Sequence, residues 1–140
     1  MVEQTTLKDR KYNSFRRVFT LGEFVREYVE GAIDLARGNP CLDDYDQILR
    51  DRIATRFSLS VEEMRDIEKP FYWFLFSDVN GSPISYQQAQ RSGESGHVRI
   101  RQISPDSIDK AVEHILEKSG EILDCRIRKV LVTSANADIV

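Results

Sequence analysis

A run of six consecutive apolar or aromatic residues, 71–76, constrains the fold of this chain more than any other feature. The run leads into the polar stretch 78–83, whose Asn-Gly pair suits the positive backbone angles of a tight hairpin turn. A short apolar run that ends in turn residues is typical of a strand covered on both faces. We therefore predict a hairpin with strands over 71–77 and 84–90, and we place Trp73 in the central core.

The size of the chain, 140 residues, is that of one ordinary domain, which folds without a disulfide or a structural metal. Its apolar fraction of 41% and its charged fraction of 31% are those of a globular protein. Cys41 and Cys125 lie far apart, so neither a disulfide framework nor the close spacing of a zinc site is present. We predict one domain over 1–140, two buried free thiols, no cofactor and no metal.

The amino-terminal residues 1–12 are polar and charged, so no secretory signal is visible. Nowhere do about 18 apolar residues occur together, which is the length that a membrane span requires. We predict a cytoplasmic protein with no membrane partner.

Charge is distributed unevenly along the chain, whose net charge is −3. Residues 1–19 carry a net charge of +3, whereas residues 20–70 carry −5. A protein that coats nucleic acid needs a dense field of Lys and Arg, which this distribution does not provide. A local basic patch stays open as an alternative.

The first predicted helix begins with a capping box, in which the Thr20 hydroxyl and the Glu23 carboxylate each accept a hydrogen bond from a free backbone N–H. Gly38 and the residues after it end this helix. Its apolar residues follow the spacing of one helix face: Leu21, Phe24, Val25, Tyr28, Val29, Ala32, Ile33 and Ala36.

Two further helices complete the predicted helical half. An apolar stripe indicates a helix over 42–57. A second capping box, Ser60 with Glu63, opens a short helix that ends before Pro70.

The last third of the chain is predicted to add two more strands. Residues 98–103 alternate as a strand, 105–119 form a helix that Gly120 closes, and 122–133 form the fourth strand. The length of the intervening helix indicates a right-handed crossover between parallel strands.

The predicted fold class is therefore α+β. A basic arm or short strand over 1–19 precedes a three-helix layer over 20–69, and a four-stranded mixed sheet of order ββ-β-α-β follows over 71–134. The unpaired edge of the hairpin leaves a homodimer open as an alternative.

Two Arg-x-Arg pairs on predicted strands form the most specific candidate site. Alternation places Arg99 with Arg101, and Arg126 with Arg128, on one face each, where four guanidinium groups would make a basic stripe suited to phosphate or carboxylate. The alternative is that these arginines pair with the acidic residues of the helical half.

The loop 91–97 is the second candidate, because it is rich in Gly and Ser and joins two predicted strands. Its binding residues are predicted to be Arg91, Glu94 and His97. It is not a phosphate-binding P-loop, since it has no Gly-Lys-Ser/Thr ending and leads into a strand. His97 is also the best candidate for a general acid or base, although neighbours in sequence rarely form a catalytic triad.

The pattern as a whole favours a small binding or regulatory protein of the adaptor, inhibitor or immunity type that acts through contact with another protein. The first alternative is a nucleic-acid-binding module that uses the arginine stripe. The second is a small hydrolase or transferase that uses His97. The lack of a catalytic grouping favours a protein that is not an enzyme.

Overall fold

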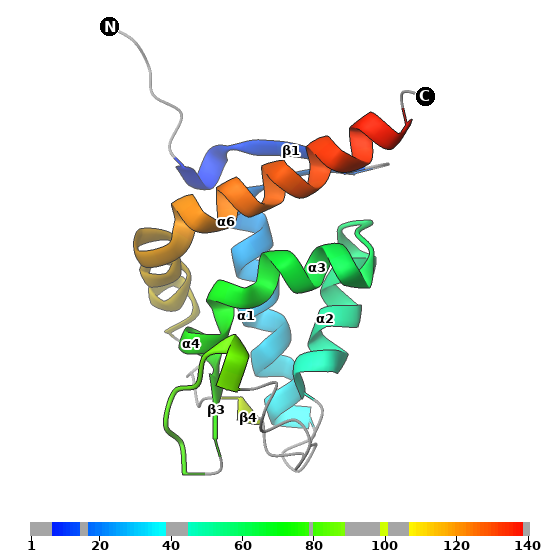
Figure 1. Ribbon diagram of the computed structural model, residues 1–140. Coiled ribbons are helices and arrows are strands. Elements are labelled where there is room, and N and C mark those ends of the chain that lie inside the picture. Colours follow the sequence, from blue (N-terminus) through cyan, green and yellow to red (C-terminus); the bar gives the residue numbers. More distant parts are fainter. Residues whose placement is uncertain are drawn as a thin grey trace, which may run out of the picture.

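The computed structural model describes residues 7–14, 17–38, 45–78, 80–88, 99–100 and 107–138. Helices dominate these residues (Figure 1). The described elements are, in chain order, η1 (Leu7–Asp9), β1 (Lys11–Ser14), β2 (Arg17–Thr20), α1 (Leu21–Gly38), α2 (Tyr45–Arg56), α3 (Val61–Glu68), η2 (Lys69–Phe71), α4 (Tyr72–Leu75), β3 (Phe76–Ser77), β4 (Arg99–Ile100) and α6 (Ile108–Asp138).

The three predicted amino-terminal helices are confirmed, and so are the starts of the first and the third; the second is described from Tyr45, and its predicted start at residue 42 lies outside the described residues. The Thr20 hydroxyl accepts a hydrogen bond from the backbone N–H of Glu23 at 3.1 Å, and α1 begins at the next residue after Thr20. At α3, Ser60 and Glu63 form both halves of the capping box, at 3.1 and 2.8 Å. Local side-chain chemistry therefore sets these helix starts.

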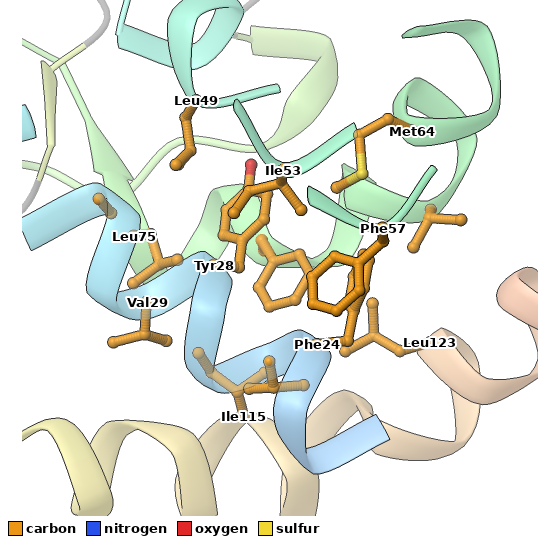
Figure 2. Close-up of a cluster of buried hydrophobic side chains, with 14 of the residues drawn as sticks. Phe24, Tyr28, Val29, Leu49, Ile53, Phe57, Met64, Leu75, Ile115 and Leu123 are labelled. Atoms are coloured by element: carbon orange, nitrogen blue, oxygen red, sulfur yellow. The ribbon is translucent and has the colours of Figure 1, made fainter. Parts of the chain in front are cut away.

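The core lies where α1 meets the other helices. Figure 2 shows side chains from α1, α2, α3, α4 and α6 pointing into one cluster. Aromatic rings fill much of it: Phe57 lies 4.7 Å from Phe19 and 5.1 Å from Phe24 between ring centroids, and Tyr28 stacks on Phe71 at 4.0 Å. Such pairs add to the free energy gained by burial alone.

The predicted four-stranded sheet is wrong. The described strands form two separate antiparallel pairs, β1 with β2 and β3 with β4. The turn is present, since Gly81 has a φ of +83° and Ser77 bridges Pro83, but residues 86–88 form a helical turn instead of a strand. Of the predicted strand 98–103, the structure describes a strand at Arg99–Ile100, and residues 101–103 lie outside the described part.

The apolar run 71–76 is mostly helical, which corrects its assignment as a strand. Pro70 occupies the first turn of η2, where its missing N–H costs nothing, and the helical path continues into α4. The burial pattern is that of a helix: Phe71, Tyr72 and Leu75 are buried, whereas Trp73 is 55% exposed. Our placement of Trp73 in the central core is therefore also wrong.

The predicted strand over 122–133 is part of α6, so the crossover unit does not exist. Ile115, Leu123 and Ile127 are buried with helical spacing along α6, and they pack against the core. Gly120 does not end the helix. A Cβ at this position would lie 2.6 Å from the Leu7 Cδ2, so a larger residue here would make the Leu7 side chain of η1 shift.

The amino-terminal arm forms the β1–β2 hairpin, which docks through Tyr12 and Phe19 and is fastened to α6 (Figure 1). The Tyr12 hydroxyl donates to Asp124 Oδ1 at 2.6 Å, and Arg10 and Arg128 donate to Oδ2 of the same carboxylate. This buried carboxylate therefore has three donors, which offset the cost of removing it from water.

The contrast between Phe71 and Trp73 tests this packing. We expect Phe71→Ala to lower the free energy of unfolding by about 3–5 kcal/mol, because it leaves a cavity in the core. Trp73→Ala should lower it by less than about 1 kcal/mol, as for most exposed positions. Urea denaturation of both variants measures the difference, and a larger loss for Trp73→Ala would contradict the helical assignment of the run.

Candidate functional site

A groove of about 840 Å³ is lined by residues of η2, α4, the 85–87 segment and α6. Three cationic side chains, Lys69, Lys118 and Arg126, line it, and no carboxylate occurs among its described lining residues. Its other members are Pro70, Trp73, Phe74, Ser85, Tyr86, Gln87, His114, Ser119 and Ile122. We call it the basic groove.

Exposed apolar surface distinguishes the basic groove from ordinary protein surface. Trp73 and Ile122 both line the groove and are 55% and 51% exposed. Phe74 meets His114 edge to face at 5.4 Å, and the Lys69 Nζ lies 5.1 Å from the centre of the Tyr86 ring. The groove thus combines aromatic and cationic groups.

A second groove of about 720 Å³ adjoins the first and shares Ile122 and Arg126 with it. It carries four carboxylates and two cations, and we call it the acidic groove. Its lining residues are Ser60, Glu62, Glu63, Asp66, Glu121, Ile122, Cys125, Arg126, Lys129 and Val130.

One stripe of α6 runs through both grooves. Lys118, Ile122, Arg126 and Val130 follow each other at intervals of four residues, which places them on one face of the helix. Where the grooves meet, Arg126 Nη1 donates to the backbone carbonyl of Asp66 at 2.8 Å. This hydrogen bond joins α6 to α3 and holds the two walls together.

A buried polar network lies behind η2 and α4, which form the wall of the basic groove that faces α6. Arg50 of α2 and Glu68 at the end of α3 form an ion pair, and both side chains are almost completely buried. The Tyr28 hydroxyl donates to Glu68 Oε2 at 3.0 Å, and Arg50 Nη2 donates to the Tyr72 hydroxyl at 3.0 Å. Tyr72 meets the ring of Tyr86 edge to face at 5.1 Å. The network therefore connects the core to Tyr86, which lines the basic groove.

Arg126 and Arg128 do not lie on one face of a strand, as the predicted arginine stripe requires. Arg126 and Arg128 lie on a helix, where residues two apart point in different directions. Arg126 lines both grooves, whereas Arg128 pairs with Asp124 of its own helix at 3.1 Å. The structure places Arg99 in β4 but describes nothing of its side chain.

The other predicted binding residues, Arg101, Arg91, Glu94 and His97, lie outside the described residues, as does the 91–97 loop. Their roles stay predictions. Cys125 is exposed, which contradicts its assignment as a buried thiol, and Cys41 lies outside the described part of the chain.

Lys69, Trp73 and Lys118 are the site residues that the sequence analysis missed. Had residues 122–133 been assigned to a helix, the four-residue spacing of Lys118, Ile122 and Arg126 would have indicated a stripe with both apolar and cationic members. The exposure of Trp73 follows from the helical path of 71–75, which the apolar run concealed.

Within the described residues, no group of three or more His, Cys, Asp or Glu side chains is arranged to hold a metal ion. No helix there is both long and apolar enough to cross a membrane. No protein-family model, no curated protein sequence and no solved structure matches this chain.

Removal of Glu68 tests the buried network. We expect Glu68→Ala to lower the free energy of unfolding by about 3–5 kcal/mol, because it leaves the Arg50 charge buried without its carboxylate. Glu62→Ala, on the exposed side of α3, should change it by about 0.5 kcal/mol or less. Equal losses for the two variants, measured by urea denaturation, would show that the pair does not hold the fold.

The stability at high pH provides a second test. Burial, followed by the charge of Glu68, raises the pKa of Tyr28 well above its ordinary value of 10.0. Above pH 10 the unfolded chain therefore releases a proton that the folded protein retains, so stability falls by up to about 1.4 kcal/mol per pH unit for this tyrosine. Tyr28→Phe should show a correspondingly shallower fall between about pH 10 and 11.5 in urea titrations, and an unchanged slope would contradict the burial of this hydroxyl.

Proposed function

We propose that this protein is a binding protein that holds an acidic segment of another protein in the basic groove. The composition of the groove carries the proposal: three cations and the exposed side chains of Trp73 and Ile122 occur together, without a carboxylate among the described lining residues. A binding or regulatory role of the adaptor or inhibitor type fits such a site.

Each part of the groove has a matching part in the proposed partner. Carboxylates of the segment pair with Lys69, Lys118 and Arg126, while an apolar side chain covers Trp73 and Ile122. Tryptophan at the centre of a contact contributes much of the affinity when a partner removes it from water. The cations contribute selectivity and the rate of association.

A nucleic acid matches the site less well. The chain has a net charge of −3, and the acidic groove, with four carboxylates, would repel a phosphate backbone that extended beyond the basic groove. Ile122 and Pro70 also offer apolar surface that phosphates do not use. The nucleic-acid-binding module stays a prediction, as does a hydrolase or transferase that uses His97.

Selection from a phage-displayed library of random peptides tests the proposal. We expect the protein to enrich peptides in which Asp and Glu flank a Leu, Ile or Phe. The double variant Lys69→Glu/Lys118→Glu should bind these peptides at least about tenfold more weakly, because two attractive charge pairs become repulsive. Fluorescence anisotropy of the labelled peptides measures the dissociation constants.

A matched variant controls for the change in net charge. Lys8→Glu/Lys110→Glu alters the charge by the same amount at two exposed positions outside the groove, and it should bind like the unmodified protein. Enrichment of peptides without acidic residues, or an equal loss in the control variant, would contradict the proposal. Tight binding of a single-stranded oligonucleotide with steep salt dependence would instead favour the nucleic-acid-binding module.

A further inference from the structure

We infer that the acidic segment is one end of an amphipathic helix that lies along α6 across both grooves, with its basic end over the acidic groove. This inference rests on the proposed function, because it takes the position of the acidic end from it. It adds the conformation of the partner segment and the order of its charges.

The two grooves form one track along α6. They share Ile122, which is 51% exposed, and Arg126, which joins α6 to α3 through the Asp66 carbonyl. An occupant that covers Ile122 therefore reaches the lining of both grooves.

The charge along this track reverses sign. The basic groove carries three cations, whereas the acidic groove has two more carboxylates than cations. A segment with carboxylates along its whole length would meet Glu62, Glu63, Asp66 and Glu121 at its far end, and like charges repel. A segment that is acidic at one end and basic at the other meets the opposite charge throughout.

A helix suits this track better than an extended strand. Helix α6 forms one wall of both grooves; α3 faces it in the acidic groove, and η2, α4 and residues 85–87 face it in the basic groove. None of these lining segments is a strand, so they offer no strand edge for pairing. An extended segment would lose hydrogen bonds to water without replacing them, whereas a helix satisfies its own backbone.

The length of the track sets the length of the helix. His114 and Val130 are the outermost residues of α6 that line the two grooves, and at 1.5 Å per residue the stretch between them is about 24 Å long. A partner helix of about four turns covers most of it, with apolar residues three or four apart facing Trp73 and Ile122.

Extension of a selected peptide tests the inference. The acidic peptide from the library is lengthened by about two helical turns that contain Lys and Arg, at its amino end in one version and at its carboxyl end in the other. We expect one version to bind about tenfold more tightly than the parent peptide, and its circular dichroism to become more helical on binding. The version that gains affinity reveals the direction of the partner helix.

Four controls make the result specific. The same extension with Glu in place of Lys and Arg should bring no gain, and a proline in the middle of the extended peptide should remove it. Glu62→Lys/Glu121→Lys should abolish the gain, whereas Asp51→Lys/Glu113→Lys, at exposed positions outside the grooves, should preserve it.

The outcomes separate the inference from the proposed function. If the parent peptide binds in the basic groove but neither extension adds affinity, the inference is wrong and the proposed function stands. A gain that survives Glu62→Lys/Glu121→Lys or the proline also overturns the inference. If the library yields no acidic peptide that depends on Lys69 and Lys118, both are wrong.

Discussion

The buried ion pair between Arg50 and Glu68 is the interaction on which the rest of this structure depends. It joins α2 to the end of α3, where the chain turns into η2, and the hydroxyls of Tyr28 and Tyr72 hydrogen-bond to it. Burial of two charges is costly, and their attraction offsets this cost only if hydrogen bonds satisfy the remaining polar atoms. The tyrosines supply these bonds, and they come from α1 and α4. Four helices are thereby held in one arrangement around a charge pair, and η2 and α4 are fixed in the positions from which Trp73 and Lys69 line the basic groove.

One short segment serves both the core and the surface. Phe71 stacks on Tyr28 inside the core, whereas Trp73, two residues later, stands in the basic groove. This division is a consequence of helical geometry, because residues two apart point in different directions. In the predicted strand, which was to be covered on both faces, all of these aromatic rings would have been buried. Trp73 is 55% exposed and lines the basic groove together with Lys69 and Lys118.

The parts of the fold that the sequence predicted correctly are those encoded by local chemistry. Thr20 and Ser60 mark helix starts because their hydroxyls accept hydrogen bonds from nearby backbone N–H groups, and the apolar face of α1 is regular enough to show its period. The segments 71–76 and 122–133 were assigned wrongly because their aromatic and β-branched residues favour strands, while packing against α1 decides in favour of helix. The candidate site shared this error: Arg126 was placed on a strand, whereas it lies on α6, where it lines both grooves.

The fluorescence of Trp73 provides the most direct test that the basic groove binds an acidic protein segment, because it is the only tryptophan in the chain. The measurement is a titration with a selected acidic peptide that lacks tryptophan, followed by quenching with acrylamide. Our account predicts a shift of the emission to shorter wavelength and slower quenching, and neither change in Lys69→Glu/Lys118→Glu. An emission spectrum that stays the same while the peptide saturates the protein would show that the peptide binds elsewhere, and would contradict the assignment of this groove.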